Sequence, residues 1–221
     1  MREIVFDTET TGIFPGDGHR IVEIGAVEMV GKVVTGRSFH TYIDPERPMP
    51  KDAQAVHGLS TAFLTGQPIF EAVIDEFLAF IGEDPLVAHN AVFDMEFLNW
   101  ELKRCGKPVI PHARAIDTLE MARKKHPGGK NNLDGLCARY NIDLSARTKH
   151  GALLDAELLA QVYVELCGGR QIGFDLASQA VVETAPVERV AFESRVHAAS
   201  AEELERHAAF VAGLRDPIWL H

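Results

Sequence analysis

The chain has 221 residues, of which 46% are apolar and 24% are charged, and its formal net charge at pH 7 is −10. This composition is ordinary for a globular protein with a sizeable core, and the negative charge argues against a protein that holds nucleic acid tightly by itself. No apolar run approaches the roughly 18 residues of a membrane span. The apolar run at the N-terminus is too short, and too soon followed by an acid, for a signal peptide. We therefore expect a soluble, cytoplasmic protein.

The cysteines are Cys105, Cys137 and Cys167, an odd number without a CxxC pair. Reduced thiols that line a core are the simplest interpretation. A structural zinc site or a disulfide is the alternative.

Three β-strands are predicted near the N-terminus, over residues 4–6, 20–30 and 33–43, because these segments are rich in Val and Ile. Gly31-Lys32 separates the last two and predicts a tight turn. Strands joined by so short a turn pair in antiparallel fashion.

Helices and strands alternate in the next part of the chain. Apolar residues recur at helical spacing over residues 70–81. Residues 86–88 predict a short buried strand, and Asn90 is suited to cap the helix that follows. The pattern then predicts a strand over residues 114–118, a helix from an Asn131 or Asn132 cap to about Tyr140, and a helix over residues 151–167.

This order of elements predicts an α/β domain with a mixed sheet over residues 1–168. Residues 169–185 have weak periodicity and predict a linker. In residues 186–221, a capping-box pattern at Ser200 predicts a helix to about Leu214. The apolar end of the chain is too short for its own core, so we expect it to dock on another protein, with packing against the main domain as the alternative.

Asp7 and Glu9 place two carboxylates at the end of the first predicted strand. Residues i and i+2 of a strand point to the same face. Carboxylates this close repel each other unless a cation lies between them, and hard divalent cations prefer oxygen ligands. A solvated strand end is the alternative.

Three further residues extend this set. Asp155 falls on the apolar stripe of its predicted helix, where an ionised carboxylate is costly unless it is paired or metal-bound. Asp94 lies in the first turn after Asn90, where the helix dipole alone would favour an acid. His150 must precede the last helix to share a site with Asp155, since residues i and i+5 lie about 140° apart on a helix. A histidine on such a loop is suited to act as a general base.

Three segments that contain these residues resemble known motifs. Residues 4–12 (IVFDTETTG), 88–94 (AHNAVFD) and 150–156 (HGALLDA) resemble the three motifs of the DEDD superfamily of exonucleases, in its histidine-containing variant. The resemblance is closer still to the epsilon proofreading subunits of bacterial DNA polymerase III, supported by residues 20–28 and 133–140.

The resemblance implies a ribonuclease-H-like fold, with a five-stranded mixed sheet flanked by helices. It implies two divalent metal ions, Mg²⁺ or Mn²⁺, bound by Asp7, Glu9, Asp94 and Asp155, with His150 completing the catalytic set. The implied activity is 3′→5′ exonucleolytic removal of mispaired nucleotides from a DNA primer terminus, which releases 5′-mononucleotides.

The resemblance also implies binding residues. Thr8, Thr10, Gly12 and His57 would lie near the frayed or single-stranded 3′ nucleotide, with turn formation and helix flanking as alternatives. The charge pattern, independently of the resemblance, shows a basic run at residues 123–126 with Lys130, which either contacts phosphates or forms a solvated face.

Two partner-binding segments are implied beyond the catalytic domain. Gln171, Phe174 and Leu176 match a motif that binds the sliding clamp, with an ordinary linker as the alternative. Residues 186–221, which include Trp219, would bind the polymerase alpha subunit and place the protein in a nucleoid-associated replisome.

Three other functions are compatible with parts of this pattern. An RNA-trimming exonuclease of the same superfamily would share the acids, although it needs no polymerase-binding tail. A non-catalytic subunit that stabilises a polymerase would share the tail, although it has no reason to keep an acid on a core stripe. A repair exonuclease that never meets a replicase would lack the tail's partner.

Overall fold

The computed structural model describes residues 1–145, 147, 149–169 and 198–214. The chain divides into two compact units, Met1–Phe174 and Asp175–His221, and each is described by itself.

Several predictions from the sequence lie outside the described residues. They are most of the expected linker and the partner-binding residues Gln171, Phe174, Leu176 and Trp219.

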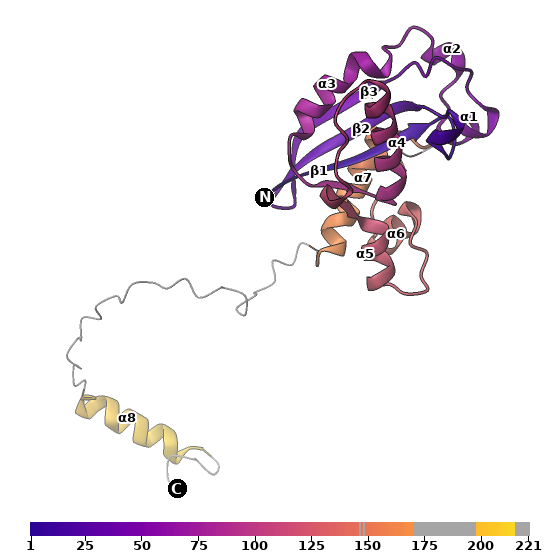
Figure 1. The fold of residues 1–221 in the computed structure, drawn as a ribbon. Coiled ribbons are helices and arrows are strands. Elements are labelled where there is room, and N and C mark those ends of the chain that lie inside the picture. The colour runs from indigo at the N-terminus through magenta and orange to yellow at the C-terminus, as the bar shows by residue number, and fades with distance from the viewer. Residues whose placement is uncertain (146, 148, 170–197, 215–221) are drawn as a thin grey trace, which may run out of the picture. The chain divides into compact units, whose positions relative to one another are not determined.

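A five-stranded mixed sheet forms the centre of the first unit, with strand order β3-β2-β1-β4-β5 (Figure 1). The first strand is β1 (Arg2–Thr10), and β2 (Ile21–Val30) pairs with it in antiparallel fashion. The strand β3 (Val33–Tyr42) is in turn antiparallel to β2. The short strands β4 (Leu86–Ala88) and β5 (Ala115–Asp117) run parallel to β1 on its other side. This topology confirms the predicted fold class.

Helices cover both faces of the sheet. The sequence pattern correctly predicted four of them in this unit and missed the short helices α1, α2 and α5, whose few turns carry no clear apolar stripe. The helices are α1 (Lys51–His57), α2 (Thr61–Leu64), α3 (Phe70–Ile81), α4 (Ala91–Arg104), α5 (Thr118–Lys125), α6 (Leu133–Tyr140) and α7 (Ala152–Leu166), with 3₁₀ turns η1 (Pro15–Asp17) and η2 (His112–Arg114).

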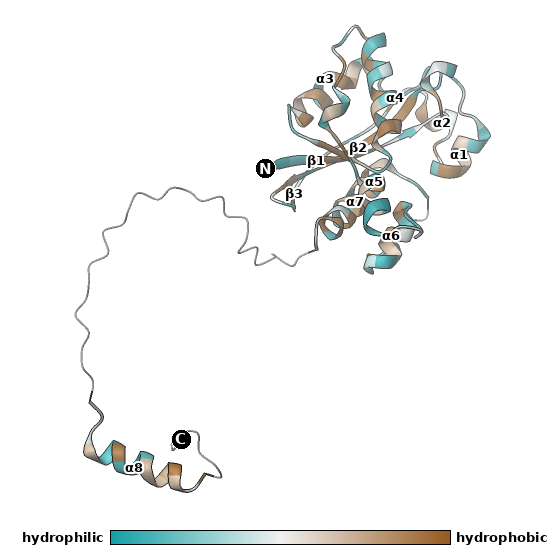
Figure 2. Ribbon diagram, turned by 60° about the horizontal axis from the view of Figure 1, so that its bottom comes forward, coloured by the Kyte–Doolittle hydropathy of each residue, from teal (hydrophilic) through white to brown (hydrophobic). Residues whose placement is uncertain are grey.

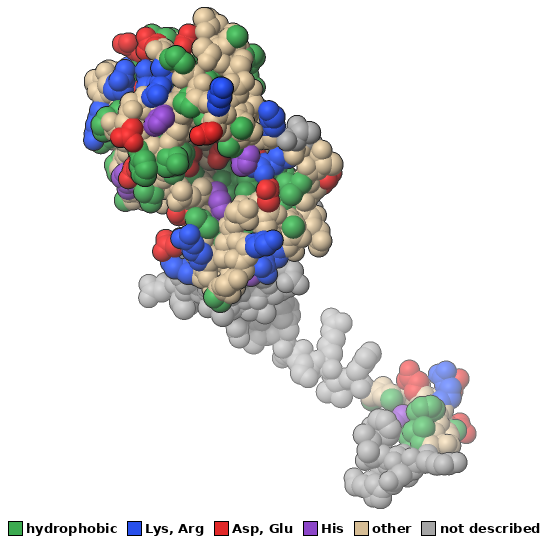
Figure 3. All heavy atoms as spheres, turned by 90° about the vertical axis from the view of Figure 1, so that its right-hand side faces the viewer, with side chains coloured by type: hydrophobic (Ala, Val, Ile, Leu, Met, Phe, Trp, Pro, Cys, Tyr) green, Lys and Arg blue, Asp and Glu red, His purple; other side chains and the backbone are tan. Residues whose placement is uncertain are grey.

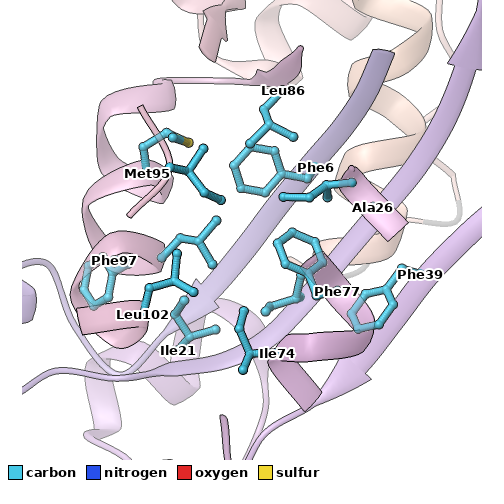
Figure 4. Packing of buried hydrophobic residues seen from close by; sticks show 14 of the residues in the cluster. Phe6, Ile21, Ala26, Phe39, Ile74, Phe77, Leu86, Met95, Phe97 and Leu102 are labelled. Carbon is cyan, nitrogen blue, oxygen red and sulfur yellow. The ribbon is translucent and has the colours of Figure 1, made fainter. Parts of the chain in front are cut away.

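Alternation along β1 builds two cores, one on each face of the sheet. Phe6 belongs to a cluster with side chains of α3 and α4, among them Phe77 and Met95 (Figure 4). Val5 belongs to a second cluster on the opposite face, with Leu159 and other residues of α7. In Figure 2 the central strands are correspondingly hydrophobic. Both faces of β1 are therefore covered by helices, and polar residues lie near its C-terminal end.

The cysteines are free thiols. Cys137 is buried and Cys105 is partly buried, as expected for core thiols. Cys167, the C-cap residue of α7, is exposed, so the expected core position is wrong for this cysteine. Among the described residues, no helix has the length and apolarity needed to cross a membrane.

The second unit contains α8 (Ala201–Ala212). Ser200 accepts a hydrogen bond from the Glu203 main chain and Glu203 reciprocates, which confirms the predicted capping box. Leu204 and Phe210 are exposed on this helix.

Candidate active site

The end of β1 carries Glu9 in a buried, acidic setting. In the antiparallel register Glu9 lies opposite Glu23 of β2, so two carboxylates face each other across neighbouring strands. Burial raises the pKa of Glu9 to about 8, and the charges of Asp155, Glu23 and Asp94 add to the effect. Glu23, which the sequence analysis did not single out, also contacts His40, with 2.7 Å between Oε1 and Nε2.

Asp7 precedes Glu9 on the same face of β1 and has the most acidic surroundings. Burial raises the pKa of the Asp7 carboxyl well above its usual range, and the charges of Asp94, Glu9 and Asp155 raise it further. The geometry brings together the four acids that the sequence pattern grouped: ligand atoms of Glu9 and Asp155 lie within 4.8 Å of each other, and Asp94 is bonded to Thr8, between Asp7 and Glu9.

Asp94 reaches the site from the first turn of α4. It is buried, and its Oδ1 accepts hydrogen bonds from the Thr8 main-chain N–H at 3.1 Å and the Thr8 Oγ1 at 2.7 Å. Burial raises its pKa to about 7, although the bonds from Thr8 oppose the shift. Asp94 is thus fixed to the strand segment between Asp7 and Glu9.

The predicted cap of α4 is correct in position and wrong in chemistry. Asn90 is the N-cap residue, but its φ of 68° is left-handed and its side chain makes no capping bond. A capping side chain needs an extended backbone at this residue. Instead, the Asn90 N–H donates to Asp117 Oδ1 at 3.1 Å, which ties the start of α4 to the end of β5.

Gly25 allows Asp155 to reach the site. It lies opposite Asp7 on β2. A Cβ at this position would lie 2.1 Å from the Leu153 main-chain N and 2.3 Å from the Ala152 carbonyl C, so only glycine lets the start of α7 approach the sheet so closely. A glycine inside a Val- and Ile-rich strand was the available signal. Asp155 is buried as predicted.

His150 lies on the loop before α7, as the helical geometry predicted. Its Nδ1 is 3.1 Å from Asp155 Oδ2, and its main-chain N–H donates to the Val56 carbonyl at 3.4 Å. Glu9, His150 and Asp155 each offer one ligand atom, and these atoms all lie within 4.8 Å of one another. This grouping is compact enough to hold one cation.

Arg147 is a charged member of the site that the sequence analysis missed. Its Nε and Nη2 lie 2.5 and 2.6 Å from the two Asp155 carboxylate oxygens, and its Nη1 pairs with Asp134 of α6. Burial alone would raise the pKa of Asp155, but hydrogen bonds from His150 and Arg147 outweigh it and lower the pKa. No periodicity distinguishes a loop arginine, so its role is visible only in three dimensions.

The predicted substrate residues surround the acids, and each has contacts within the protein. Thr8 bonds to Asp94, as above, and Thr10 Oγ1 donates to the Gly12 carbonyl at 2.6 Å. A Cβ on Gly12 would overlap the His19 ring. His57 is buried at the end of α1, and its Nδ1 accepts the Leu59 N–H at 3.0 Å.

The donor set fits hard divalent cations. Asp7, Glu9, Asp94 and Asp155 supply only oxygen atoms, which such cations prefer. Without a cation, the raised pKa values of three of these acids record the cost of burying like charges together. Figure 3 shows acidic side chains in a hollow on this face, with histidines at its edge.

Acids converging from β1, α4 and α7 on a mixed five-stranded sheet define the site of a nuclease, and the comparisons agree. A family model described as Exonuclease matches residues 4–163. The DNA polymerase III subunit epsilon of Rickettsia felis is 50% identical, with 97% of each chain covered. The subunit of the same name from Escherichia coli is 43% identical, with 94% of this chain and 91% of that protein covered. The chain belongs to the exonuclease family and, within it, to the DNA polymerase III epsilon subunits.

Solved structures agree with this fold. Exonuclease X in complex with 5′ overhanging duplex DNA is 26% identical, with a TM-score of 0.58 over 74% of this chain and 90% of that one. The nuclease domain of 3′hExo, a DEDDh family member bound to rAMP, has a TM-score of 0.65 at 18% identity, over 75% of this chain and 91% of that one.

Proposed function

We propose that the protein is a 3′→5′ exodeoxyribonuclease that removes mispaired nucleotides from the primer terminus as the proofreading subunit of a replicative polymerase. The convergence of Asp7, Glu9, Asp94 and Asp155 beside His150 carries this proposal. The relatives named as polymerase subunits support the assignment to replication.

Two divalent ions, Mg²⁺ or Mn²⁺, fit the acids. Asp7, Glu9 and Asp155 would hold one, and Asp7 with Asp94 the other. When bound, the ions would offset the charge of the acids, lower the pKa of a water molecule and stabilise the leaving 3′ oxygen. When Asp155 binds the cation, Arg147 would still form its ion pair with Asp134.

His150 acts as the general base in this proposal. Its side chain is 47% exposed, so water and substrate have access to the ring, and Arg147 Nη2 and Asp155 Oδ2 hold the ring at distances of 2.8 and 3.1 Å from Nδ1. The ring accepts a proton from the attacking water, which adds to phosphorus as the 3′ oxygen leaves. The products are a 5′-mononucleotide and a DNA strand that is one residue shorter.

A frayed 3′ nucleotide is the proposed substrate, because a paired terminus must first unstack. Thr8, Thr10, Gly12 and His57 would contact it. Of these, His57 follows Val56, whose carbonyl accepts the His150 main-chain N–H at 3.4 Å.

The proposed partners are the polymerase alpha subunit, bound by residues 186–221, and the sliding clamp, bound by residues 171–176. Residues 1–168 would form the exonuclease domain and residues 169–185 the linker. This arrangement would place the protein in the cytoplasmic replisome.

Hydrolysis of a mismatched primer–template in Mg²⁺ tests the proposal. Asp155→Asn should lower the rate at least ~100-fold, since positioning and acid–base effects of this kind contribute about 10²–10⁴-fold. Asp75→Asn is the control, because Asp75 is exposed and pairs with Lys107 at the surface. Equal rates for Asp155→Asn and the wild type would refute the site, and faster hydrolysis of RNA than of DNA would favour the RNA-trimming alternative.

A further inference from the structure

A pocket of about 380 Å³ lies between the end of β4 and the segment that joins α5 to α6. None of its residues belongs to the catalytic or nucleotide-binding set proposed above. They are His89, Leu119, Arg123, Gly129, Asn131 and Asn132.

Both walls of this pocket continue into the acid cluster. His89 connects β4 to α4, whose first turn carries Asp94. On the other wall, Asn132 caps α6 by accepting the Gly135 N–H at 3.2 Å, and α6 carries Asp134 in its first turn. Arg147 joins Asp134 to the catalytic acids. The pocket therefore lies along the same rim of the molecule as the proposed active site.

Hydrogen bonds hold the pocket walls in place. His89 Nδ1 is 2.9 Å from Thr118 Oγ1, and Asn131 Nδ2 donates to the His126 carbonyl at 3.1 Å. His126 is in turn held by Tyr140, with 2.7 Å between Nε2 and the hydroxyl oxygen. A ligand would meet a shape that is already formed, which reduces the entropy lost on binding.

Arg123 differs from the other cations of α5. Lys124 pairs with Glu120 at 3.0 Å, and Lys125 donates to the Glu165 carbonyl at 2.6 Å. Arg123 has no carboxylate within ion-pair distance in the part of the chain that the structure describes, and it is the one cation of these three that lines the pocket.

A second guanidinium supports the positive character of this pocket. A Cβ on Gly129 would lie 2.6 Å from Arg139 Nη2, so Arg139 packs directly against the pocket wall. Lys130, beside it in sequence, is exposed. On a chain with a net charge of −10, a pocket flanked by these cations selects for an anion.

We propose that this pocket binds a backbone phosphate of the DNA strand upstream of the scissile bond, with Arg123 as the main ligand. The inference rests on the proposed function, because a 3′ end held at the acids leads the strand along the rim. Guanidinium groups suit this role, since their fork of N–H donors matches phosphate oxygens. The pocket would thus add affinity for strands with several linkages without reading their sequence.

Two substrates separate this subsite from the chemistry of the acids. One is a single-stranded oligodeoxynucleotide, and the other is the p-nitrophenyl ester of thymidine 5′-phosphate, which has no upstream phosphate. For Arg123→Gln in the full chain, the ratio of oligonucleotide to ester kcat/KM should fall about 10-fold, the usual loss for a hydrogen bond to a charged group. The matched control is Lys124→Gln, which removes the neighbouring exposed cation outside the pocket and should leave the ratio unchanged.

Neutral linkages locate the phosphate. A set of oligonucleotides carries one methylphosphonate each, at a different one of the first few upstream linkages. At one linkage, this neutral group should lower the hydrolysis rate of the wild type. The same group should leave the rate of Arg123→Gln unchanged, because that variant has already lost the phosphate contact. The dependence of oligonucleotide binding on salt should also weaken in Arg123→Gln, by about one released ion.

The outcomes distinguish the subsite from the proposed function. If the wild type hydrolyses neither substrate in Mg²⁺, the proposed exonuclease fails. If it hydrolyses both, but Arg123→Gln and Lys124→Gln change the ratio equally or no linkage distinguishes Arg123→Gln from the wild type, the exonuclease stands and the phosphate pocket is refuted.

Discussion

Glu9 and Asp7 show how burial and like charge act on a single residue before any cation is bound. Glu9 has a pKa of about 8, and the pKa of Asp7 is also raised. A carboxyl whose pKa is raised by folding binds its proton more tightly in the folded state than in the unfolded state. Stability must then depend on pH in a direction opposite to that of most acids.

In EDTA, which removes divalent cations, the protein should become less stable as the pH rises. For Glu9 the folded state holds the extra proton between its ordinary pKa of 4.5 and the raised value of about 8, so stability should fall as pH rises through this window. In EDTA we expect Tm to decrease by several degrees from pH 5 to pH 8, beyond the change seen for Glu9→Gln. Thermal unfolding followed by circular dichroism measures this. Equal pH dependence in the two proteins would contradict the raised pKa.

Arg147 carries the second prediction at this scale. Its guanidinium contacts the Asp155 carboxylate directly. Removing one partner of a buried ion pair leaves an uncompensated charge and typically costs about 3–5 kcal/mol. Arg147→Gln should therefore lower Tm in EDTA, and Mg²⁺ should restore more of the loss than it adds to the wild type. A variant equally unstable with and without Mg²⁺ would show that Arg147 does not share Asp155 with a cation.

At the scale of elements, the sequence predicts those helices and strands whose signals lie within a few neighbouring residues. Periodic apolar residues located α3, and Val and Ile content with a turn at Gly31-Lys32 located β2 and β3 within a residue or two. The short helix α5 escaped detection because half of its residues are charged and it carries no clear apolar stripe. Local signals therefore determined most elements, including the loop position of His150.

The candidate site was predictable where its residues follow local rules and not where they depend on packing. Asp155 was recognisable because an acid interrupts an apolar stripe. Arg147 and Glu23 were not, because their importance comes from their partners on other elements, Asp155 and Glu9. Gly25 carried a local signal as a glycine inside a strand, but its partner, the start of α7, is visible only in the fold. The assignment of roles to individual acids stays a prediction that mutation must test.

Gly25 provides the prediction at the scale of elements. A methyl group here would overlap the main chain of α7, so Gly25→Ala must push the helix from the sheet. We expect a loss of about 1–3 kcal/mol in the free energy of unfolding and a fall in kcat of about 100-fold, since a displacement of about 1 Å is enough for such a loss. Gly16→Ala is the control, because a Cβ there meets nothing within 4 Å. Full activity in Gly25→Ala would contradict the close approach.

At the scale of the whole molecule, the two units should separate by function. Every described residue of the proposed catalytic and nucleotide-binding set lies in the first unit, Met1–Phe174. A chain ending at residue 174 should therefore hydrolyse oligonucleotides with the kcat/KM of the full chain and fail to bind the polymerase alpha subunit. Hydrolysis assays and pull-down with purified alpha subunit measure the two properties. Trp219→Ala in the full chain should weaken only the binding, and retained binding by the shortened chain would refute the assigned tail.

The acids of the site come from β1, α4 and α7, which lie at the beginning, the middle and the end of the first unit. A chain still on the ribosome lacks Asp155 and His150 until α7 has been made, because the strand that carries Asp7 and Glu9 is translated long before it. A half-synthesised copy would therefore lack part of the proposed catalytic set and be unable to cut the nucleic acids around it. In the proposed site, the order of residues along the gene would delay a destructive chemistry until the last of these residues has been made.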